Sequence, residues 1–347
     1  MKREESRALQ GIAVLLMLFH HFFLYTWLFD DVPGFLSHPA VTEHFAWCGR
    51  ICVGIFSFVS GYGMYHALKK ADSWGKAFAG SGRRILRLYL RLWCVLGLML
   101  LLWSTVFGET IVWAELPMNL TAMDPTYNAT WWFVREYLWM LLLAPFGRML
   151  LIGDKRQKVV SAAAAILGVG MLLVLPRIPG GSVVVDTVKT YAELVFLILF
   201  AEGFFTAYLQ ERFAKRRGEK KLPAPVRAAA GILLMAAAVT ARYFTTKQAA
   251  DAKQDILIVP VFALAAVLLM RAFAPLEKGC GFFGKHSLYL WLVHGLVWQR
   301  TFVFAKHLGH PLLYYLFELL LSLAVALLFW AAERMFVSHF KGKGEGK

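Results

Sequence analysis

Residues 311–333 read PLLYYLFELLLSLAVALLFWAAE, in which Glu318 is the only charged residue before the final Glu333. A helix needs about 20 mostly apolar residues to cross the hydrocarbon core of a bilayer. The apolar residues do not alternate with polar ones, as they would in the strands of a membrane barrel. Because the backbone must satisfy its own hydrogen bonds in lipid, this segment is predicted to be a transmembrane helix.

Nine further segments share this character. Of the 347 residues, 59% are hydrophobic and 17% are charged, whereas soluble domains are about 25% charged. We therefore predict an all-α polytopic integral membrane protein that forms one domain over residues 1–347 and ends in a basic cytoplasmic tail, residues 334–347. The other nine predicted spans are 8–29, 45–68, 85–107, 131–152, 159–176, 190–210, 224–244, 254–274 and 284–305.

The distribution of positive charge predicts the orientation of these spans. The net charge is +15, which in a soluble protein would indicate a nucleic-acid partner. Here most of the 37 lysines and arginines fall in alternate connections between the spans. The positive-inside rule then places both termini in the cytoplasm, and no nucleic-acid partner is expected. The opposite connections hold Arg177, Lys189, Lys247, Lys253 and Lys306.

The cysteines do not form a convincing metal site. Cys48 and Cys52 are four positions apart and would share one helix face, where metal ligands could lie. No further Cys or His completes a set of ligands. We interpret both as small packing residues and expect no metal.

Polar residues of the first predicted span are candidates for function, because ionisable groups at membrane depth are expensive. His20 and His21 are adjacent and therefore differ by about 100° around a helix, so we expect only one of them to face a cavity. Gln10 lies three turns before His21 and shares its face. One histidine is expected to be structural and the other functional.

The second span carries Arg50 near its outer end and Ser60-Gly-Tyr-Gly63 toward the cytoplasm. The small residues Ser60 and Gly61 permit close helix packing. A substrate contact that includes Ser60 and Tyr62 is an equally good interpretation.

The third span opens with three arginines, Arg84, Arg87 and Arg91, which form one stripe along a helix. The stripe can be explained by the positive-inside rule together with side chains that snorkel to the surface. Alternatively it binds phosphate, because guanidinium groups pair well with phosphate oxygens. Arg91 lies a full turn deeper than Arg87, which favours the phosphate site.

Other buried polar residues lie in later spans. Trp131 and Trp132 are typical of an aromatic belt at the outer membrane interface. The adjacent Arg135 and Glu136 point to different faces, so at least one requires a partner on another helix. Taken singly, the remaining ionisable residues are typical of structural positions: Glu193, Glu202, His286, His294 and Glu318.

Taken together and in this order, the polar segments resemble membrane-bound acyltransferase family 3, whose members are integral O-acyltransferases of bacterial cell-surface glycans. The family's opening Arg-x10-His motif and second-helix Phe-Phe-x-x-Ser-Gly signature have similar counterparts here, and so do its later segments. The matching segments are Leu9-Gln-Gly-Ile-Ala-Val with Phe19-His-His21, Val53-Gly-Ile-Phe-Ser-Phe-Val-Ser-Gly-Tyr62, Arg84-Ile-Leu-Arg-Leu-Tyr89, Trp132-Phe-Val-Arg-Glu-Tyr137 and Phe283-Gly-Lys-His-Ser-Leu-Tyr-Leu-Trp-Leu-Val-His294.

One position departs from the family pattern. If His21 is the motif histidine, Gln10 stands where the family has Arg or Lys. Gln10 supplies no charge, although Arg7 lies one turn earlier.

The resemblance implies transfer of an acyl group, acetyl above all, from cytoplasmic acyl-CoA to a hydroxyl of an extracytoplasmic carbohydrate or glycolipid. It implies a multi-pass protein of the bacterial cytoplasmic membrane that uses acyl-CoA as a substrate and holds no resident cofactor. The donor's phosphates would be bound by Arg84, Arg87 and Arg91. Further candidates for the cavity wall are Gln10, Arg50, Ser60, Tyr62, Trp132, Arg135, His286 and His294.

The same resemblance implies a catalytic role for His21 as general base on the acceptor hydroxyl, since imidazole suits proton transfer near neutral pH. Glu136 would orient the acceptor or His21, and Arg135 would pair with Glu136. No Ser or Cys stands in a nucleophile motif, so direct transfer is expected.

A transporter or lipid flippase is the competing class, with Arg50, Glu136, Glu193 and Glu202 along a translocation path. Transporters often have paired halves with broken helices, and the sequence has no such pairing. A purely structural membrane subunit is disfavoured by the number of buried ionisable groups.

Overall fold

The computed structural model describes residues 1–24, 39–174, 194–214, 223–246 and 252–344. Within these ranges every regular element is helical, which confirms the predicted all-α fold. The α-helices are α1 (Arg3–Leu24), α2 (Pro39–Gly49), α3 (Ile51–Leu68), α4 (Trp74–Thr105), α5 (Leu116–Thr121), α6 (Phe133–Ile152), α7 (Lys155–Val174), α9 (Leu194–Ala214), α10 (Ala224–Thr245), α11 (Asp255–Ala272), α12 (Ala274–Ala305) and α13 (Pro311–Gly344). Short 3-10 turns are η3 (Trp113–Glu115), η4 (Ala129–Trp132) and η6 (Lys306–Leu308).

Among the described residues, 7 helical segments are long and apolar enough to cross a membrane, so the chain is a multi-pass membrane protein. They are Arg3–Leu24, Ala40–Leu68, Trp74–Thr105, Leu194–Phe213, Ala224–Thr245, Asp255–Ala272 and Pro311–Ser338.

The three remaining predicted spans coincide with α6, α7 and α12. Helices α6 and α12 are more polar because they carry residues such as Arg135 and Glu136 in α6 and Lys285 in α12. The count of ten spans therefore stays a prediction. Glu193, with the start of the predicted span 190–210, lies outside the described residues.

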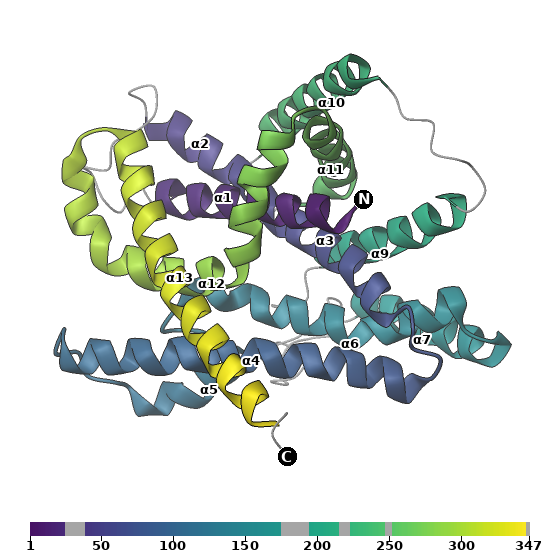
Figure 1. Cartoon of the computed structure of the whole chain (residues 1–347), viewed down its shortest axis with the longest axis horizontal. Helices are drawn as coiled ribbons and strands as arrows, with labels where there is room; N and C mark the ends of the chain where they lie inside the picture. The colour runs from purple at the N-terminus through teal and green to yellow at the C-terminus, as the bar shows by residue number, and fades with distance from the viewer. Residues whose placement is uncertain (25–38, 175–193, 215–222, 247–251, 345–347) are drawn as a thin grey trace.

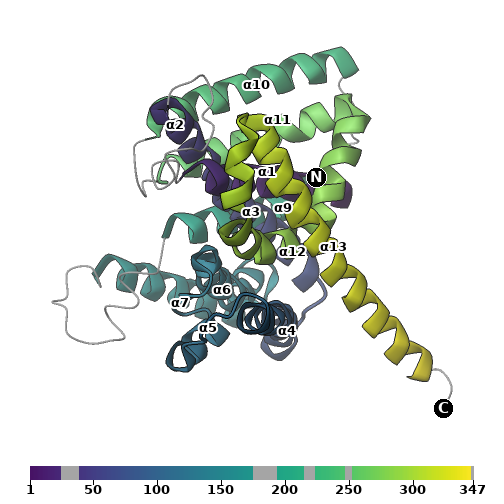
Figure 2. The same cartoon turned by 90° about the vertical axis from the view of Figure 1, so that its left-hand side faces the viewer.

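The helices form two groups, which Figures 1 and 2 show from two directions. Helices α4, α6 and α7 lie together with α5 along one side. Above them pack α1, α3, α9 and α12, and α10 with α11 covers the far side. Helix α13 runs down the side of this bundle, and its last turns extend away from it (Figure 2).

Glycines set the two closest helix crossings. A Cβ atom on Gly11 of α1 would overlap the carbonyl oxygen of Cys280 in α12, and one on Gly284 would overlap that of Arg7. Gly61 of α3 and Gly203 of α9 approach each other's helix in the same way. Small residues allow such close backbone contact between membrane helices. The packing interpretation of the Ser-Gly-Tyr segment therefore holds for Gly61.

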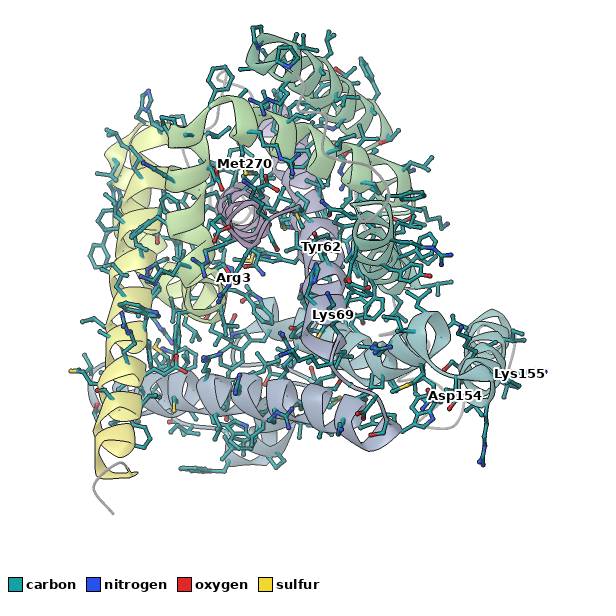
Figure 3. All side chains as sticks on the ribbon, turned by 45° about the vertical axis from the view of Figure 1, so that its right-hand side comes forward. Arg3, Tyr62, Lys69, Asp154, Lys155 and Met270 are labelled. Atoms are coloured by element: carbon teal, nitrogen blue, oxygen red, sulfur yellow. The ribbon has the colours of Figure 1, made fainter. Side chains whose placement is uncertain are left out.

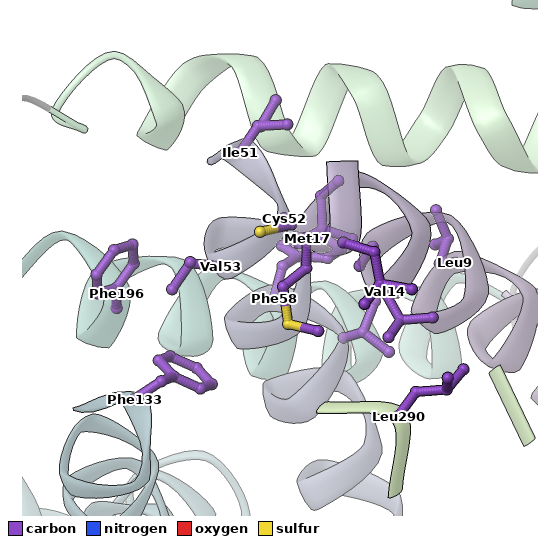
Figure 4. Packing of buried hydrophobic residues seen from close by; sticks show 14 of the residues in the cluster. Leu9, Val14, Met17, Ile51, Cys52, Val53, Phe58, Phe133, Phe196 and Leu290 are labelled. Carbon is purple, nitrogen blue, oxygen red and sulfur yellow. The ribbon is translucent and has the colours of Figure 1, made fainter. Parts of the chain in front are cut away.

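Apolar side chains fill the space around these crossings. Leu9, Val14 and Met17 of α1 are buried against Phe58 of α3 and Leu290 of α12, as Figure 4 shows. This packing fixes the height of α1 relative to α3 and α12. It thereby positions the polar residues of the first helix within the bundle.

Two helices are longer than their predicted spans. Helix α4 begins at Trp74 rather than at residue 85, because Ser73 caps it by accepting a hydrogen bond from the backbone NH of Lys76. The three arginines consequently lie inside α4 and not at its start. Helix α13 continues to Gly344, so most of the predicted tail 334–347 extends the last helix.

The connection between α4 and α6 folds back into the bundle. The hydroxyl of Tyr89, halfway along α4, donates a hydrogen bond to the carbonyl of Thr121, and the indole NH of Trp93 donates to Leu120; both distances are 2.8 Å. Trp131 is fully buried, and its indole NH donates to the carbonyl of Leu292 in α12 at 3.0 Å. The predicted place of Trp131 in an interfacial belt is therefore wrong.

We expect Gly284→Ala to destabilise the protein, because the added methyl group meets the backbone of α1, which cannot give way as a side chain can. Overpacking of this kind costs about 1–3 kcal/mol. The melting temperature in detergent should fall. Gly279→Ala in the same helix is the control, because nothing lies within 4 Å of its Cβ position. Equal melting temperatures for the two variants would contradict this account of the crossing.

Candidate active site

One large cavity lies between α1, α3, α4, α6 and α12, with a volume of about 870 Å³. Residues from helices far apart in the sequence line this cavity. It brings together Gln10, His21, Arg50, Ser60, Arg84, Arg87, Arg91 and Trp132 from the residues singled out in the sequence.

The cavity has two chemically different ends. Helices α1 and α12 run side by side in the same direction, since Gly11 meets Gly284 and His21 meets His294. Gln10 and His21, both in the wall, are therefore about 16 Å apart along α1 at 1.5 Å per residue. We call the two ends the basic end, with Gln10, Ser60, Arg84, Arg87 and Lys285, and the histidine end, with His20, His21, Arg50, Trp132 and Trp298.

At the basic end, Tyr137 of α6 joins two neighbouring helices. Its side chain lines the cavity close to those of Arg84 in α4 and Ser60 in α3. Arg87, one turn further along α4, is exposed and also lines the cavity. Two guanidinium groups thus face one end of the cavity from a single helix, an arrangement suited to an anionic ligand.

Arg91 is engaged differently. Its guanidinium donates to one carboxylate oxygen of Glu333 in α13 at 2.6 and 2.9 Å, and the hydroxyl of Tyr289 donates to the other at 2.9 Å. Arg91 lines the cavity together with Arg84 and Arg87, but it is also held by Glu333, and its contact with donor phosphates stays a prediction. The sequence did not indicate Glu333, because this residue follows an apolar run 242 positions away.

At the histidine end, His21 is paired with a second histidine. Nδ1 of His21 lies 2.8 Å from Nε2 of His294, and Nδ1 of His294 lies 2.8 Å from the carbonyl oxygen of Trp291. His294 is fully buried and does not line the cavity, whereas His21 does. His294 therefore contacts His21 on the side of the ring that faces away from the cavity.

Both adjacent histidines reach the cavity, contrary to the expectation that only one would. The cavity extends around the end of α1 toward Trp47, whose ring centroid lies 5.6 Å from that of His20. Because the cavity extends this far around the helix, both His20 and His21 reach it although their side chains point in different directions. Nδ1 of His20 lies 2.7 Å from the carbonyl oxygen of Ala46.

Arg50 supplies a positive charge at this end. It stands at the break between α2 and α3, with its guanidinium carbon 6.0 Å from the ring centroids of both Trp132 and Phe196. Guanidinium groups are attracted to aromatic faces at such distances. Nearby, Arg242 of α10 and Asp255 of α11 form a buried ion pair of 2.9 Å that holds these two helices together.

Tyr62 and His286 do not belong to the cavity wall. The Tyr62 hydroxyl bonds to the carbonyl of Met1 at 2.6 Å and to Gln210 at 2.8 Å, which joins α3 to the first residues and to α9. Figure 3 labels Tyr62 on α3 and Arg3 at the start of α1. The buried ring of His286 packs against Trp330 of α13, with centroids 4.9 Å apart. Both residues have structural contacts.

Arg135 and Glu136 also lie outside the wall. Arg135 donates to the carbonyl of Met123 at 2.5 Å, and so holds the folded-back connection to α6. Glu136 is 1% exposed. Glu136 does not line the cavity, and its role in orienting the acceptor or His21 stays a prediction.

Several lining residues were missed by the sequence analysis. Trp291 and Trp298 are seven positions apart on one face of α12, so the helical period around His294 could have indicated them. Thr130 could not be found in this way, because it reaches the cavity through the folded-back connection.

A transport path is not supported by the same geometry. Of the four residues expected along it, Arg50 lines the cavity, whereas Glu136 and Glu202 do not. Glu193 lies outside the described residues.

Fold and site together define a multi-pass helical membrane protein with a cavity between its helices that is basic at one end and carries histidines at the other. The family model of the acyltransferase domain, acyltransferase family 3, matches residues 4–331. The chain therefore belongs to this family and is an acyltransferase. No curated protein and no solved structure matches the chain.

Proposed function

We propose that this acyltransferase moves an acetyl group from cytoplasmic acetyl-CoA to a hydroxyl of an extracytoplasmic glycan or glycolipid. The observation that carries the proposal is one cavity that contains both arginines suited to phosphates and a histidine suited to proton transfer. The family membership supports the acyltransferase chemistry.

The donor enters this cavity with its phosphates at the basic end. Arg84 and Arg87 bind the phosphate oxygens, because charge-assisted hydrogen bonds are the strong ones. The pantetheine arm then extends along α1 toward His21, about 16 Å further into the bundle. The thioester is delivered to the histidine end, while the charged part of the donor stays near the cytoplasm.

Transfer takes place at the histidine end in one displacement. Nε2 of His21 removes the proton from the acceptor hydroxyl, and the hydroxyl oxygen forms a bond to the thioester carbon. The carbon–sulfur bond breaks, and the departing sulfur takes the proton from the imidazolium. The guanidinium of Arg50, on the same side of the cavity, favours the negative charge that develops during this step.

The proposed topology places ten spans in a bacterial cytoplasmic membrane with both termini inside. The bias of Lys and Arg toward alternate connections supports it. Single cysteines introduced at Lys70 and at Trp113 should react with an impermeant thiol reagent from opposite sides of the membrane, Lys70 from the cytoplasm. The background is the variant without native cysteines, at Cys48, Cys52, Cys94 and Cys280. Labelling of the Lys70 position from outside would contradict this topology and the cytoplasmic donor site.

The function is tested with purified protein in vesicles, acetyl-labelled CoA and glycans extracted from the source membrane. We expect label to be transferred to the glycan fraction and free CoA to be released in equal amount. Release of CoA without a labelled glycan would overturn the glycan acceptor. Absence of both products would overturn the proposed donor.

A further inference from the structure

His294 has a defined pattern of protonation. Its side chain is fully buried in α12, and Nδ1 lies 2.8 Å from the carbonyl oxygen of Trp291 and 3.2 Å from that of Leu290. A carbonyl oxygen only accepts hydrogen bonds, so Nδ1 must carry a hydrogen. In a neutral imidazole the other nitrogen, Nε2, is then bare and accepts.

This bare nitrogen faces His21. Nε2 of His294 lies 2.8 Å from Nδ1 of His21, so His21 donates there and carries its own hydrogen on Nδ1. The ring centroids are 4.9 Å apart and the ring planes differ by 20°, so the two rings are nearly parallel and meet through these two nitrogens.

We infer that His294 is a positioning residue that holds His21 in the tautomer with a bare Nε2, the form able to accept a proton from the acceptor. The inference rests on the proposed function and deepens it. In the opposite tautomer Nε2 carries the hydrogen, and His21 cannot act as a base from the cavity. The backbone of α12 thus selects the reactive form of a side chain in α1.

The same contact stabilises His21 after it has taken the proton. A hydrogen bond becomes stronger when its donor is charged. The Nδ1–H bond to His294 therefore supports the imidazolium of His21. The hydrogen bond is accepted by the neutral Nε2 of His294, while the hydrogen on Nδ1 of His294 is bound by carbonyls of α12. A carboxylate is therefore not required to support the imidazolium.

The turn of α12 that carries His294 is fixed by η4. The indole NH of Trp131 donates to Leu292 at 3.0 Å, and that of Trp291 donates to Thr130 at 3.2 Å. Gly295 follows His294, and a side chain at this position would overlap Asn128 and Thr130. The folded-back connection therefore holds the orienting histidine in place.

Two matched substitutions test this role. His294→Gln retains an oxygen acceptor for the Nδ1 hydrogen of His21, whereas His294→Phe fills similar space without one. We expect His294→Phe to lower kcat about 10- to 100-fold, as loss of partners that orient other functional histidines does. KM for acetyl-CoA should not change, and His294→Gln should recover most of kcat. Equal losses in the two variants, or none in either, would overturn the inference.

A second measurement does not depend on turnover. Nitrogen-15 NMR of histidine-labelled protein, with the His21 signals assigned by comparison with His21→Gln, reports which nitrogen carries the hydrogen. We expect Nδ1–H for His21 in the original protein and in His294→Gln, and a mixture of tautomers in His294→Phe. An unchanged tautomer in His294→Phe would overturn the inference even if kcat fell. The expected spectra from a protein that transfers no acetyl group would uphold the positioning and reject the proposed function.

Discussion

His21→Ala is expected to lower kcat for acetyl transfer about 10²- to 10⁴-fold, the usual contribution of a general base. The variant should still insert into the membrane and bind CoA, because His21 lies at the histidine end and the donor's phosphates bind about 16 Å away along α1. Single-turnover rates at saturating donor, measured beside CoA binding by calorimetry, separate the two steps. A loss confined to CoA binding would contradict the assignment of His21.

His20→Ala is the control for this experiment and should cost less than tenfold. His20 also lines the cavity, but its charged neighbours are Arg50 and Arg242. A proton on His20 would therefore face positive charge, whereas His21 has the neutral His294 as its partner. If His20→Ala is inactive and His21→Ala is active, the general base is His20 and not His21.

Replacement of the arginines at the basic end should have the second largest effect. A hydrogen bond to a charged group contributes about 1.5–3 kcal/mol. Arg87→Ala is therefore expected to weaken CoA binding about 10- to 150-fold, and Arg84→Ala to a similar extent. Since these arginines contact the donor away from the reacting atoms, kcat at saturating CoA should change little. Calorimetric titration with CoA gives the dissociation constant directly.

Arg83→Ala is the matched control, because Arg83 is exposed on the same helix but does not line the cavity. Its removal lowers the overall charge equally and should leave CoA affinity within about twofold, as expected for a screened surface charge. Arg91→Ala should weaken binding less than Arg87→Ala, because Glu333 already holds Arg91. Equal effects of Arg83→Ala and Arg87→Ala would mean that the arginine stripe marks only the cytoplasmic side of the protein and does not bind CoA.

The sequence alone predicted the helical membrane fold well, because long apolar runs leave the backbone no other solution in lipid. Predicted ends of helices were less accurate. Helix α4 starts at Trp74 rather than at residue 85, because the segment of about three turns before residue 85 is amphipathic and is capped by Ser73. A search for apolar runs does not detect such turns. Trp131 was misplaced for a related reason. A tryptophan beside a polar connection is typical of the interface, and nothing local indicates that the connection folds back.

For the site, positions that share one helix were predicted, and contacts between helices were not. Gln10 and His21 were placed on one face by helical periodicity, and both line the cavity. The bonds from His21 to His294 and from Arg91 to Glu333 join residues 273 and 242 positions apart. Such contacts depend on which helices become neighbours, which a single sequence does not encode in any local pattern.

The pairing of α1 with α12 has a consequence for how the protein is made. The ribosome adds about 5–20 residues per second, so the 273 positions between His21 and His294 take about 14–55 s to synthesise. Throughout that interval His21 and Gly11 of α1 are without their partners in α12. A chain that stops before α12 therefore leaves this face of the first helix, with the His21 ring, without the helix that covers it in the finished protein.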